Sequence, residues 1–350
     1  MLASATLPKQ SYKRFILSLY ILTTLLLIGA TSSLVTGPMN LPSSEGLLTL
    51  LDKVIGSQFN SLETFQQVVI LELRLPRLLL AMSVGAILAQ CGAVMQGLFR
   101  NPLADPGIVG VSSGAAVGAV TAICLLPAAI SMITVPAFAF AGGLLTTLFV
   151  YQIARSEKGT SVLMLLLAGV AISAFSGALI GFISYFTDDE KLRALSLWQM
   201  GSLAGANSSY IGLSFLTMFF LAYFFQRQSS ALNALLLGEA EARHLGISVE
   251  ALKLKLIIIV AAGVGVAVAC SGIIGFVGLI VPHWVRMYLG PNHTSLLPVC
   301  ALCGALLLLV SDLFARTLVE PAELPVGLIT ALLGAPFFLV LLRQQRKAEF

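Results

Sequence analysis

Charged residues are scarce in this sequence. Aspartate, glutamate, lysine and arginine make up 10% of its 350 residues, whereas 58% of the residues are hydrophobic. A soluble domain is about 25% charged, so this chain has too few polar groups to cover a globular surface in water. The composition excludes a soluble, disordered or disulfide-rich secreted protein and indicates an integral membrane protein. A net charge of +4 without a basic stripe also excludes a nucleic-acid binder.

Residues that carry chemistry are equally few. The sequence has three histidines, which are scattered, and five cysteines, which all lie inside apolar runs. Cys300 and Cys303 form a C-x-x-C pair, but no second pair or nearby histidine completes a zinc site. Walker A, G-x-S-x-G and H-E-x-x-H motifs are absent from the sequence. We therefore expect no catalytic residue, no metal site and no cofactor bound by this chain.

Long uncharged runs predict an all-α integral membrane protein with a single transmembrane domain over residues 1–350. A helix needs about 20 apolar residues to cross the hydrocarbon core. The stretch Leu256–Val285 is too long for one crossing, and Gly272, Gly275 and Pro282 offer places to break it. The expected ten membrane helices are 15–35, 78–99, 108–126, 135–154, 161–186, 210–225, 256–271, 276–288, 296–313 and 326–342.

The basic residues predict which side each loop faces. With ten crossings and a cytoplasmic start, fourteen of the 20 lysines and arginines lie on the cytoplasmic side. Both termini are basic, which favours an even number of crossings with both ends in the cytoplasm. The first run is too long for a signal-peptide core, so we expect a permanent helix. Gly92 and Pro102 recur 180 positions later as Gly272 and Pro282, which favours an inverted repeat of two five-helix halves.

Two segments between the membrane helices have a helical pattern of their own. The cytoplasmic loop 231–249 is interpreted as two short helices, Ala231–Leu237 and Glu239–Leu245, interrupted by Gly238. Such a compact element favours docking of another protein, and an interfacial amphipathic element is the alternative. On the outer side, Leu192–Leu203 is predicted to form a short helix at the mouth of the bundle.

Three arginines lie at the outer ends of predicted helices. Arg74 and Arg77 precede the second helix, and Arg316 closes the ninth. A pair between Asp312 and Arg316, one turn apart, would lower the cost of charge near the membrane. Two interpretations stand: the arginines anchor the helices at the interface, or they form a basic outer rim for an acidic partner.

Ordered motifs run through most of the chain. The first half contains R-L-P-R from Arg74, G-A-V-M-Q-G from Gly92 and N-P-L-A-D-P-G from Asn101. The second half contains G-F-V-G-L-I-V-P-H from Gly275 and P-A-E-L-P-V-G from Pro321. This series resembles the permease subunits of type II ABC importers, the FecCD-like family that takes up ferric siderophores, haem and cobalamin.

The resemblance implies partners and residue roles. Members of the family are multi-pass proteins of the bacterial inner membrane that form homodimers in lipid, with the pathway at the dimer interface. Two cytoplasmic ATPase subunits carry ATP and Mg, so the permease itself is not an enzyme, and a periplasmic binding protein docks outside. Segment 231–249 matches the ATPase-coupling loop, with Leu237, Gly238, Glu239, Ala240, Arg243, Leu245 and Gly246. The docking positions match Arg74, Arg77 and Arg316.

The helix Leu192–Leu203 matches the gate region of the family and looks most like that of haem permeases. In those proteins an arginine at the position of Arg193 lies near the outer entrance, where it can meet haem propionates through paired hydrogen bonds. It can equally meet an anionic siderophore or pair with Asp189. We expect haem as the substrate, with a ferric siderophore or cobalamin as the alternative. An intramembrane enzyme using His283, or the carboxylates Asp312 and Glu323, is disfavoured, because no catalytic pair has a suitable spacing.

Overall fold

A computed structural model describes residues 9–37, 43–56, 61–156 and 159–348. Within them the chain is almost entirely helical, as expected for a membrane permease. The helices are α1 Lys9–Val35, α2 Ser43–Ile55, α3 Thr64–Val68, the π-helix η1 Val69–Arg74, α4 Leu75–Leu98, η2 Pro106–Val109, α5 Val111–Leu125, η3 Ala128–Ile130, α6 Ser131–Ala154, α7 Val162–Tyr185, α8 Asp189–Gln199, α9 Ser208–Leu237, α10 Glu239–His244, α11 Val249–Ser271, α12 Val277–Leu289, α13 His293–Thr317 and α14 Val326–Ala348. Two short antiparallel strands, β1 Arg155–Ser156 and β2 Gly159–Thr160, pair Arg155 with Thr160.

Seven described helices are long and apolar enough to cross a membrane. Two shorter apolar helices, Val111–Leu125 and Val326–Leu341, accompany them. Helix α12 has 13 residues, which span about 20 Å at 1.5 Å per residue and are too few to cross alone. The membrane architecture is therefore confirmed, whereas the count of ten crossings and the inverted repeat stay predictions.

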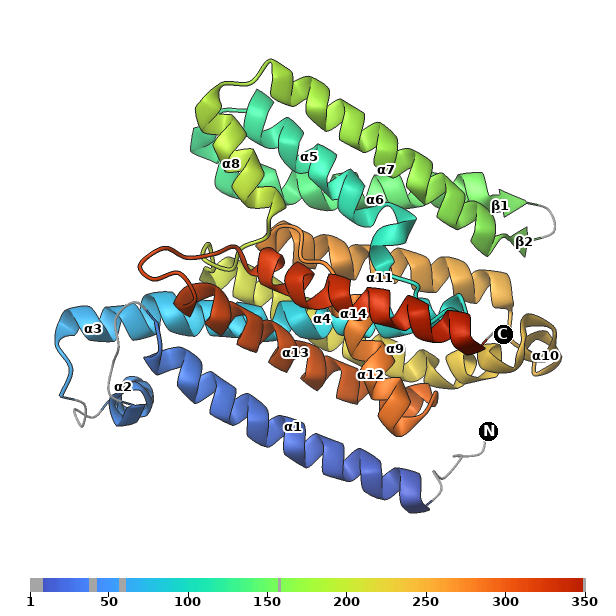
Figure 1. Ribbon diagram of the computed structural model, residues 1–350, viewed down its shortest axis with the longest axis horizontal. Helices are drawn as coiled ribbons and strands as arrows, with labels where there is room; N and C mark the ends of the chain where they lie inside the picture. The colour runs from blue at the N-terminus through green and yellow to red at the C-terminus, as the bar shows by residue number, and fades with distance from the viewer. Residues whose placement is uncertain (1–8, 38–42, 57–60, 157–158, 349–350) are drawn as a thin grey trace.

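Helix α4 forms the centre of the molecule. The most apolar window of Thr64–Leu98 is 89% buried, far more than that of the outer helices α1 and α7. Figure 1 shows α4 between α13 and α11, with α5, α6 and α7 in a separate layer. Gly85 faces the backbone of Gly304 so closely that a Cβ would collide with its carbonyl oxygen. Small residues let membrane helices approach in this way, which explains the glycine-rich sequence of the central helices.

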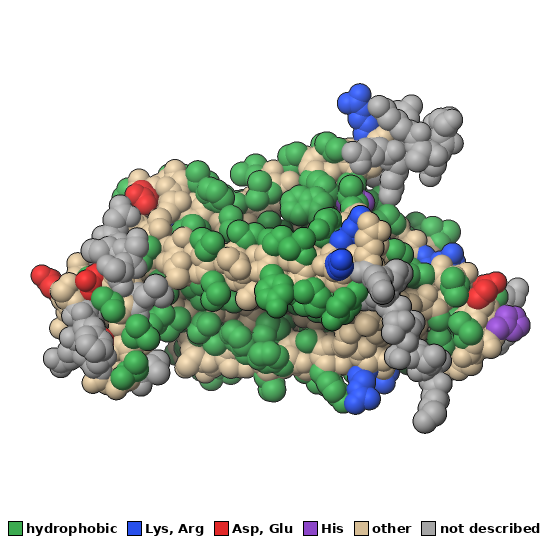
Figure 2. Space-filling view, turned by 90° about the horizontal axis from the view of Figure 1, so that it is seen from below, with side chains coloured by type: hydrophobic (Ala, Val, Ile, Leu, Met, Phe, Trp, Pro, Cys, Tyr) green, Lys and Arg blue, Asp and Glu red, His purple; other side chains and the backbone are tan. Residues whose placement is uncertain are grey.

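The outside of the bundle is apolar along its length. Leu27, Phe175 and Leu216 are each more than 60% exposed, which suits side chains that face lipid rather than water. On the face drawn in Figure 2, hydrophobic side chains cover the middle, while lysine and arginine side chains gather toward one end. On this face, basic side chains therefore lie toward one end of the bundle and apolar side chains lie along its middle.

Several predicted helix boundaries differ from the structure. The helix predicted at 210–225 is longer, and α9 runs without a break to Leu237, so the separate helix expected at Ala231–Leu237 is wrong. The helix predicted at 192–203 lies at Asp189–Gln199, because Asp188 caps it by accepting a hydrogen bond from the Lys191 amide at 3.0 Å. Helix α2 was not expected at all. Its 13 residues contain charged side chains, which hid it from a search for long apolar runs.

The break expected within Leu256–Val285 lies between α11 and α12. Gly272 ends α11 with φ 68°, and Phe276 precedes α12 with the same φ of 68°. A positive φ is ordinary for glycine but costly for phenylalanine. The glycines therefore mark the break in the sequence, while the conformation of Phe276 follows from packing, since its ring lies against Gly334 of α14.

Candidate functional site

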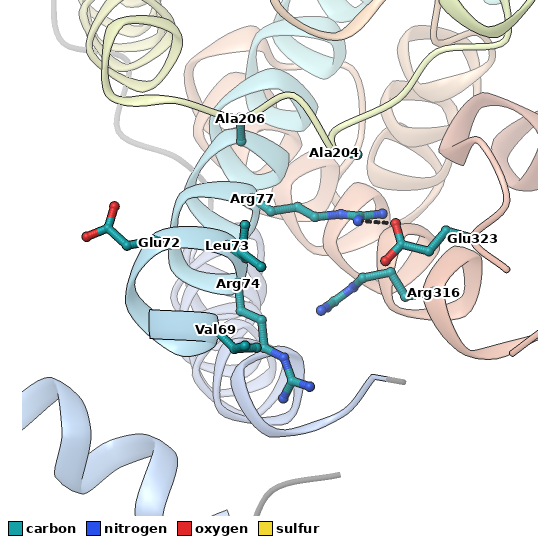
Figure 3. A pocket seen from close by; sticks show the side chains of 9 residues that line it. All are labelled: Val69, Glu72, Leu73, Arg74, Arg77, Ala204, Ala206, Arg316 and Glu323. Carbon is teal, nitrogen blue, oxygen red and sulfur yellow. Dashed lines mark hydrogen bonds and ion pairs between the residues drawn. The ribbon is translucent and has the colours of Figure 1, made fainter. Parts of the chain in front are cut away.

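A pocket of about 300 Å³ opens where α4, α13 and the α8–α9 connection meet (Figure 3). It lies toward the end of the bundle that holds α3 and α8, opposite the end that holds α10 (Figure 1). Its lining residues are Val69, Glu72, Leu73, Arg74, Arg77, Ala204, Ala206, Arg316 and Glu323. The three arginines singled out in the sequence thus lie in one place, although Arg77 and Arg316 are far apart along the chain. We call this the arginine pocket.

Two carboxylates pair with Arg77 and Arg316 of the arginine pocket. Asp312 is fully buried, with its Oδ1 2.8 Å from Arg77 Nε and its Oδ2 3.2 Å from Arg316 Nε. Arg77 Nη1 also donates to Glu323 Oε2 at 2.6 Å. Glu323 is 39% exposed and belongs to the α13–α14 connection. The arrangement is a buried ion-pair network with one carboxylate reaching the surface.

Backbone groups of α1 bind the remaining donors. Arg74 Nη1 donates to the Leu34 carbonyl at 2.8 Å, and Arg316 Nη2 donates to the Ser33 carbonyl at 3.2 Å and to Ser33 Oγ at 2.6 Å. These carbonyl groups belong to the last turn of α1. They have no hydrogen-bond donor within the helix, and the arginine side chains supply one. The π-helix η1 ends at Arg74 and is followed directly by α4, which carries Arg77. The network therefore fixes the ends of α1, α4 and α13 to one another.

This geometry changes one expectation. Arg74, Arg77 and Arg316 are only 5%, 8% and 3% exposed, so they do not form an open basic rim. The predicted Asp312–Arg316 pair is confirmed, and the anchoring interpretation is therefore the better one for the isolated chain. Sequence reasoning missed the role of Glu323, which pairs across 246 positions with Arg77. No local pattern in the sequence signals such a pair.

The predicted ATPase-coupling residues form a corner at the opposite end, between α9 and α11 (Figure 1). Leu237 and Leu245 flank the six-residue α10 and are 67% and 62% exposed. Gly238 and Gly246 take φ values of 131° and 81°, which only glycine adopts readily, and so permit the sharp turns on either side. Exposed leucines at a corner of this kind form an apolar contact surface. The other predicted residues of the corner are Glu239, Ala240 and Arg243, of which Arg243 pairs with Glu239 at 3.6 Å.

Arg193 lies on the exposed side of α8. The opposite side of this helix buries Leu195 against Val120 and Cys124 of α5. Lys191 Nζ donates to the Cys124 carbonyl at 3.1 Å, which joins α8 to the end of α5. Helix α8 is therefore fixed to α5 and presents Arg193 outward.

Comparison with known proteins gives a consistent result. Residues 25–344 match the FecCD transport family. The chain is 48% identical to the hemin transport system permease protein HmuU of Yersinia pestis over 280 residues, which are 79% of this chain and 84% of that protein. It is 44% identical to the vitamin B12 import system permease protein BtuC of Vibrio cholerae over 296 residues, 85% of this chain and 89% of that protein.

Solved structures agree with the sequence relatives. A metal-chelate type ABC transporter in an inward-facing conformation superposes with a TM-score of 0.79 at 37% identity, over 94% of this chain and 99% of that chain. The match covers nearly the whole of both chains, so it extends to the complete helical bundle. This chain therefore belongs to the FecCD transport family of membrane permeases.

Proposed function

We propose that this chain is the permease subunit of a binding-protein-dependent ABC importer that moves haem across the bacterial inner membrane. The observation that carries the proposal is the match of residues 25–344 to the FecCD transport family, together with the identity to a hemin transport permease. Two copies would form a homodimer in lipid with the pathway between them. ATP-driven rocking of the helix bundles would open that pathway alternately to each side.

Ten crossings are part of this proposal. Helix α1 begins and α14 ends at the same end of the bundle (Figure 1), which requires an even number of passages. The seven long helices, the two shorter apolar ones and the half-length α12 supply ten. Two five-helix halves would be related as an inverted repeat. The end with both helix termini and α10 would face the cytoplasm, since basic side chains accumulate on that side.

The two ends of the bundle suit different partners. The corner formed by Leu237, α10 and Leu245 offers the exposed apolar side chains that two cytoplasmic ATPase subunits would contact. ATP and Mg would bind to those subunits and not to this chain. The periplasmic binding protein would dock over the arginine pocket, at the positions Arg74, Arg77 and Arg316 that the family resemblance assigns to docking. Charge complementarity with an acidic partner would orient it there.

Haem is preferred over other cargo on two grounds. The hemin permease shares 48% identity with this chain, and Arg193 is exposed on α8 at the outer end, where it can pair with propionates. The vitamin B12 permease is nearly as similar, at 44% identity. A ferric siderophore or cobalamin is therefore the alternative cargo for the same architecture.

An enzymatic role is disfavoured by the geometry of the carboxylates. Asp312 and Glu323 are both bound by Arg77. A carboxylate whose oxygens are held by an arginine is poorly placed to accept a proton from a substrate. This arrangement fits a permease that catalyses no reaction better than it fits an enzyme.

Growth of a deletion strain tests the cargo. The strain would receive haemin, a ferric siderophore or cobalamin as the limiting nutrient, with this chain or its Arg193→Ala variant supplied on a plasmid. We expect loss of haemin use alone, restored by the chain and only weakly by Arg193→Ala. Normal growth on haemin with a defect on a siderophore or cobalamin would show that haem is not the cargo and that the defective nutrient is.

A further inference from the structure

Lys253 is a lysine buried at the first turns of α11. Only 4% of the residue is exposed, although α11 begins at the end of the bundle that also holds α10 and the β1–β2 hairpin (Figure 1). Its Nζ is 2.8 Å from Glu239 Oε1 and 3.2 Å from Glu250 Oε1. The same Nζ donates to the Thr160 carbonyl at 3.3 Å. One ammonium group therefore contacts α10, α11 and the hairpin at once.

Glu250 completes the connection to the hairpin. Its Oε2 accepts hydrogen bonds from the Thr160 amide at 2.9 Å and from Thr160 Oγ1 at 2.8 Å. Thr160 is 6% exposed and lies at the end of β2. The next residue, Ser161, caps α7 by accepting the Met164 amide at 3.3 Å. A chain of contacts thus joins α10 to the start of α7. We call it the Lys253 clamp, and it consists of Glu239, Glu250, Lys253 and Thr160.

Helix α10 depends on the Lys253 clamp for its position. It has six residues, and glycines with positive φ precede and follow it, so its own backbone does not fix its direction. Ala242 is its single buried side chain, and Glu239 supplies the ion pair to Lys253. Helix α10 also packs against α9, and a load applied to the exposed leucines beside it would reach α11 and the hairpin through the Glu239–Lys253 ion pair.

Helix α7 is suited to respond to such a load. Four of its 24 residues are buried, namely Leu165, Ala168, Gly169 and Ser176. By contrast, 16 residues of α11 are buried along its length of 23. A helix with few buried contacts moves at a lower energetic cost than one that is packed on all sides. The hairpin is the chain connection between α6 and α7, so displacement of Thr160 pulls on the end of α7.

We infer that Lys253 is a positioning residue that transmits movement of α10 to α7 through Glu250 and Thr160. The inference rests on the proposed function, in which ATPase subunits contact the α10 corner. A purely structural lysine would hold the fold together without affecting how hydrolysis is converted into transport. The Lys253 clamp instead connects the expected contact surface to a loosely packed crossing helix.

The test uses the whole complex of permease, ATPase and binding protein in proteoliposomes. Lys253→Met removes the charge and keeps an unbranched stem, and Glu250→Gln removes the negative charge that pairs with Lys253 and weakens the acceptor for Thr160 at nearly the same side-chain size. Lys255→Met is the matched control, because Lys255 is exposed on the same helix and lies over the Phe224 ring at 4.8 Å. The readouts are cargo taken up per ATP hydrolysed and hydrogen exchange at the Thr160 amide.

We expect Lys253→Met and Glu250→Gln to lower the uptake per ATP by about fivefold or more, the lower range of ordinary coupling between sites. The exchange of the Thr160 amide should rise in both variants, and Lys255→Met should match the wild type in both readouts. If either clamp variant assembles and keeps the wild-type ratio, the inference is refuted. If the wild-type complex takes up none of the three cargoes, the proposed function fails instead, whatever the variants do.

Discussion

Replacement of Asp312 tests the ion-pair network of the arginine pocket. The carboxylate is fully buried and is shared by Arg77 and Arg316, at 2.8 Å and 3.2 Å. Asp312→Asn keeps the size of the side chain and removes the negative charge. Two buried guanidinium groups would then face each other across a neutral amide. We expect a marked loss of stability, because an uncompensated buried charge is strongly unfavourable.

The size of the loss follows from the contacts that survive. Removing one partner of a buried ion pair costs about 3–5 kcal/mol. Arg77 would keep its 2.6 Å contact with Glu323, and Arg316 would keep its hydrogen bonds to Ser33. Each arginine thus retains a partner. We therefore expect the lower end of the range, a decrease of about 3 kcal/mol in the free energy of unfolding.

Unfolding in mixed micelles with increasing SDS, followed by tryptophan fluorescence, would measure the change. Ser311→Ala is the matched control, since Ser311 is also fully buried and its hydroxyl has no hydrogen-bond partner in the described part of the chain. The control should change stability little. A loss for Asp312→Asn within about 0.5 kcal/mol, the range of ordinary surface substitutions, would refute the reasoning.

The other predictions concern docking, helix packing and the ATPase. Arg74→Glu combined with Arg77→Glu should weaken binding of the periplasmic protein through like-charge repulsion, and an unchanged Kd in nanodiscs would contradict a docking role. Gly118→Leu should lower the free energy of unfolding by about 1–3 kcal/mol through overpacking, because a Cβ at this position would meet a carbonyl of α6. Gly177→Leu is the control, since a Cβ there meets open space, and equal Tm values for the two variants would argue against this packing. Gly238→Pro should uncouple ATP hydrolysis from uptake, since proline cannot adopt a φ of 131°, and full coupling would disprove the importance of this turn.

The sequence predicted those features that depend on local chemistry. Apolar runs identified the membrane helices, because their length and lack of charge are set by the bilayer. The Asp312–Arg316 pair was predictable, since residues four apart face each other on a helix and the structure confirms it. Gly272 was named as a place to break the long apolar stretch, and α11 ends there with φ 68°.

Features that depend on distant contacts were not predictable from the sequence. Glu323 and Arg77 are 246 positions apart, and Lys253 meets Thr160 across 93 positions. Both contacts arise only when separate helices pack side by side. The burial of Arg74 was missed for the same reason, because the end of α1 covers it and the Leu34 carbonyl accepts a hydrogen bond from its Nη1. Local patterns show where charges lie along the chain, but not which element faces them.

Uptake into proteoliposomes tests the central claim most directly. The vesicles would contain this chain with its ATPase, and haem, a ferric siderophore or cobalamin would be supplied on a binding protein. The account predicts that haem accumulates inside only with ATP and that the Arg193→Ala variant accumulates it more slowly. Accumulation of cobalamin or a siderophore without haem would contradict the proposed cargo. Failure of all three to enter with ATP present would contradict the assignment as an importer permease.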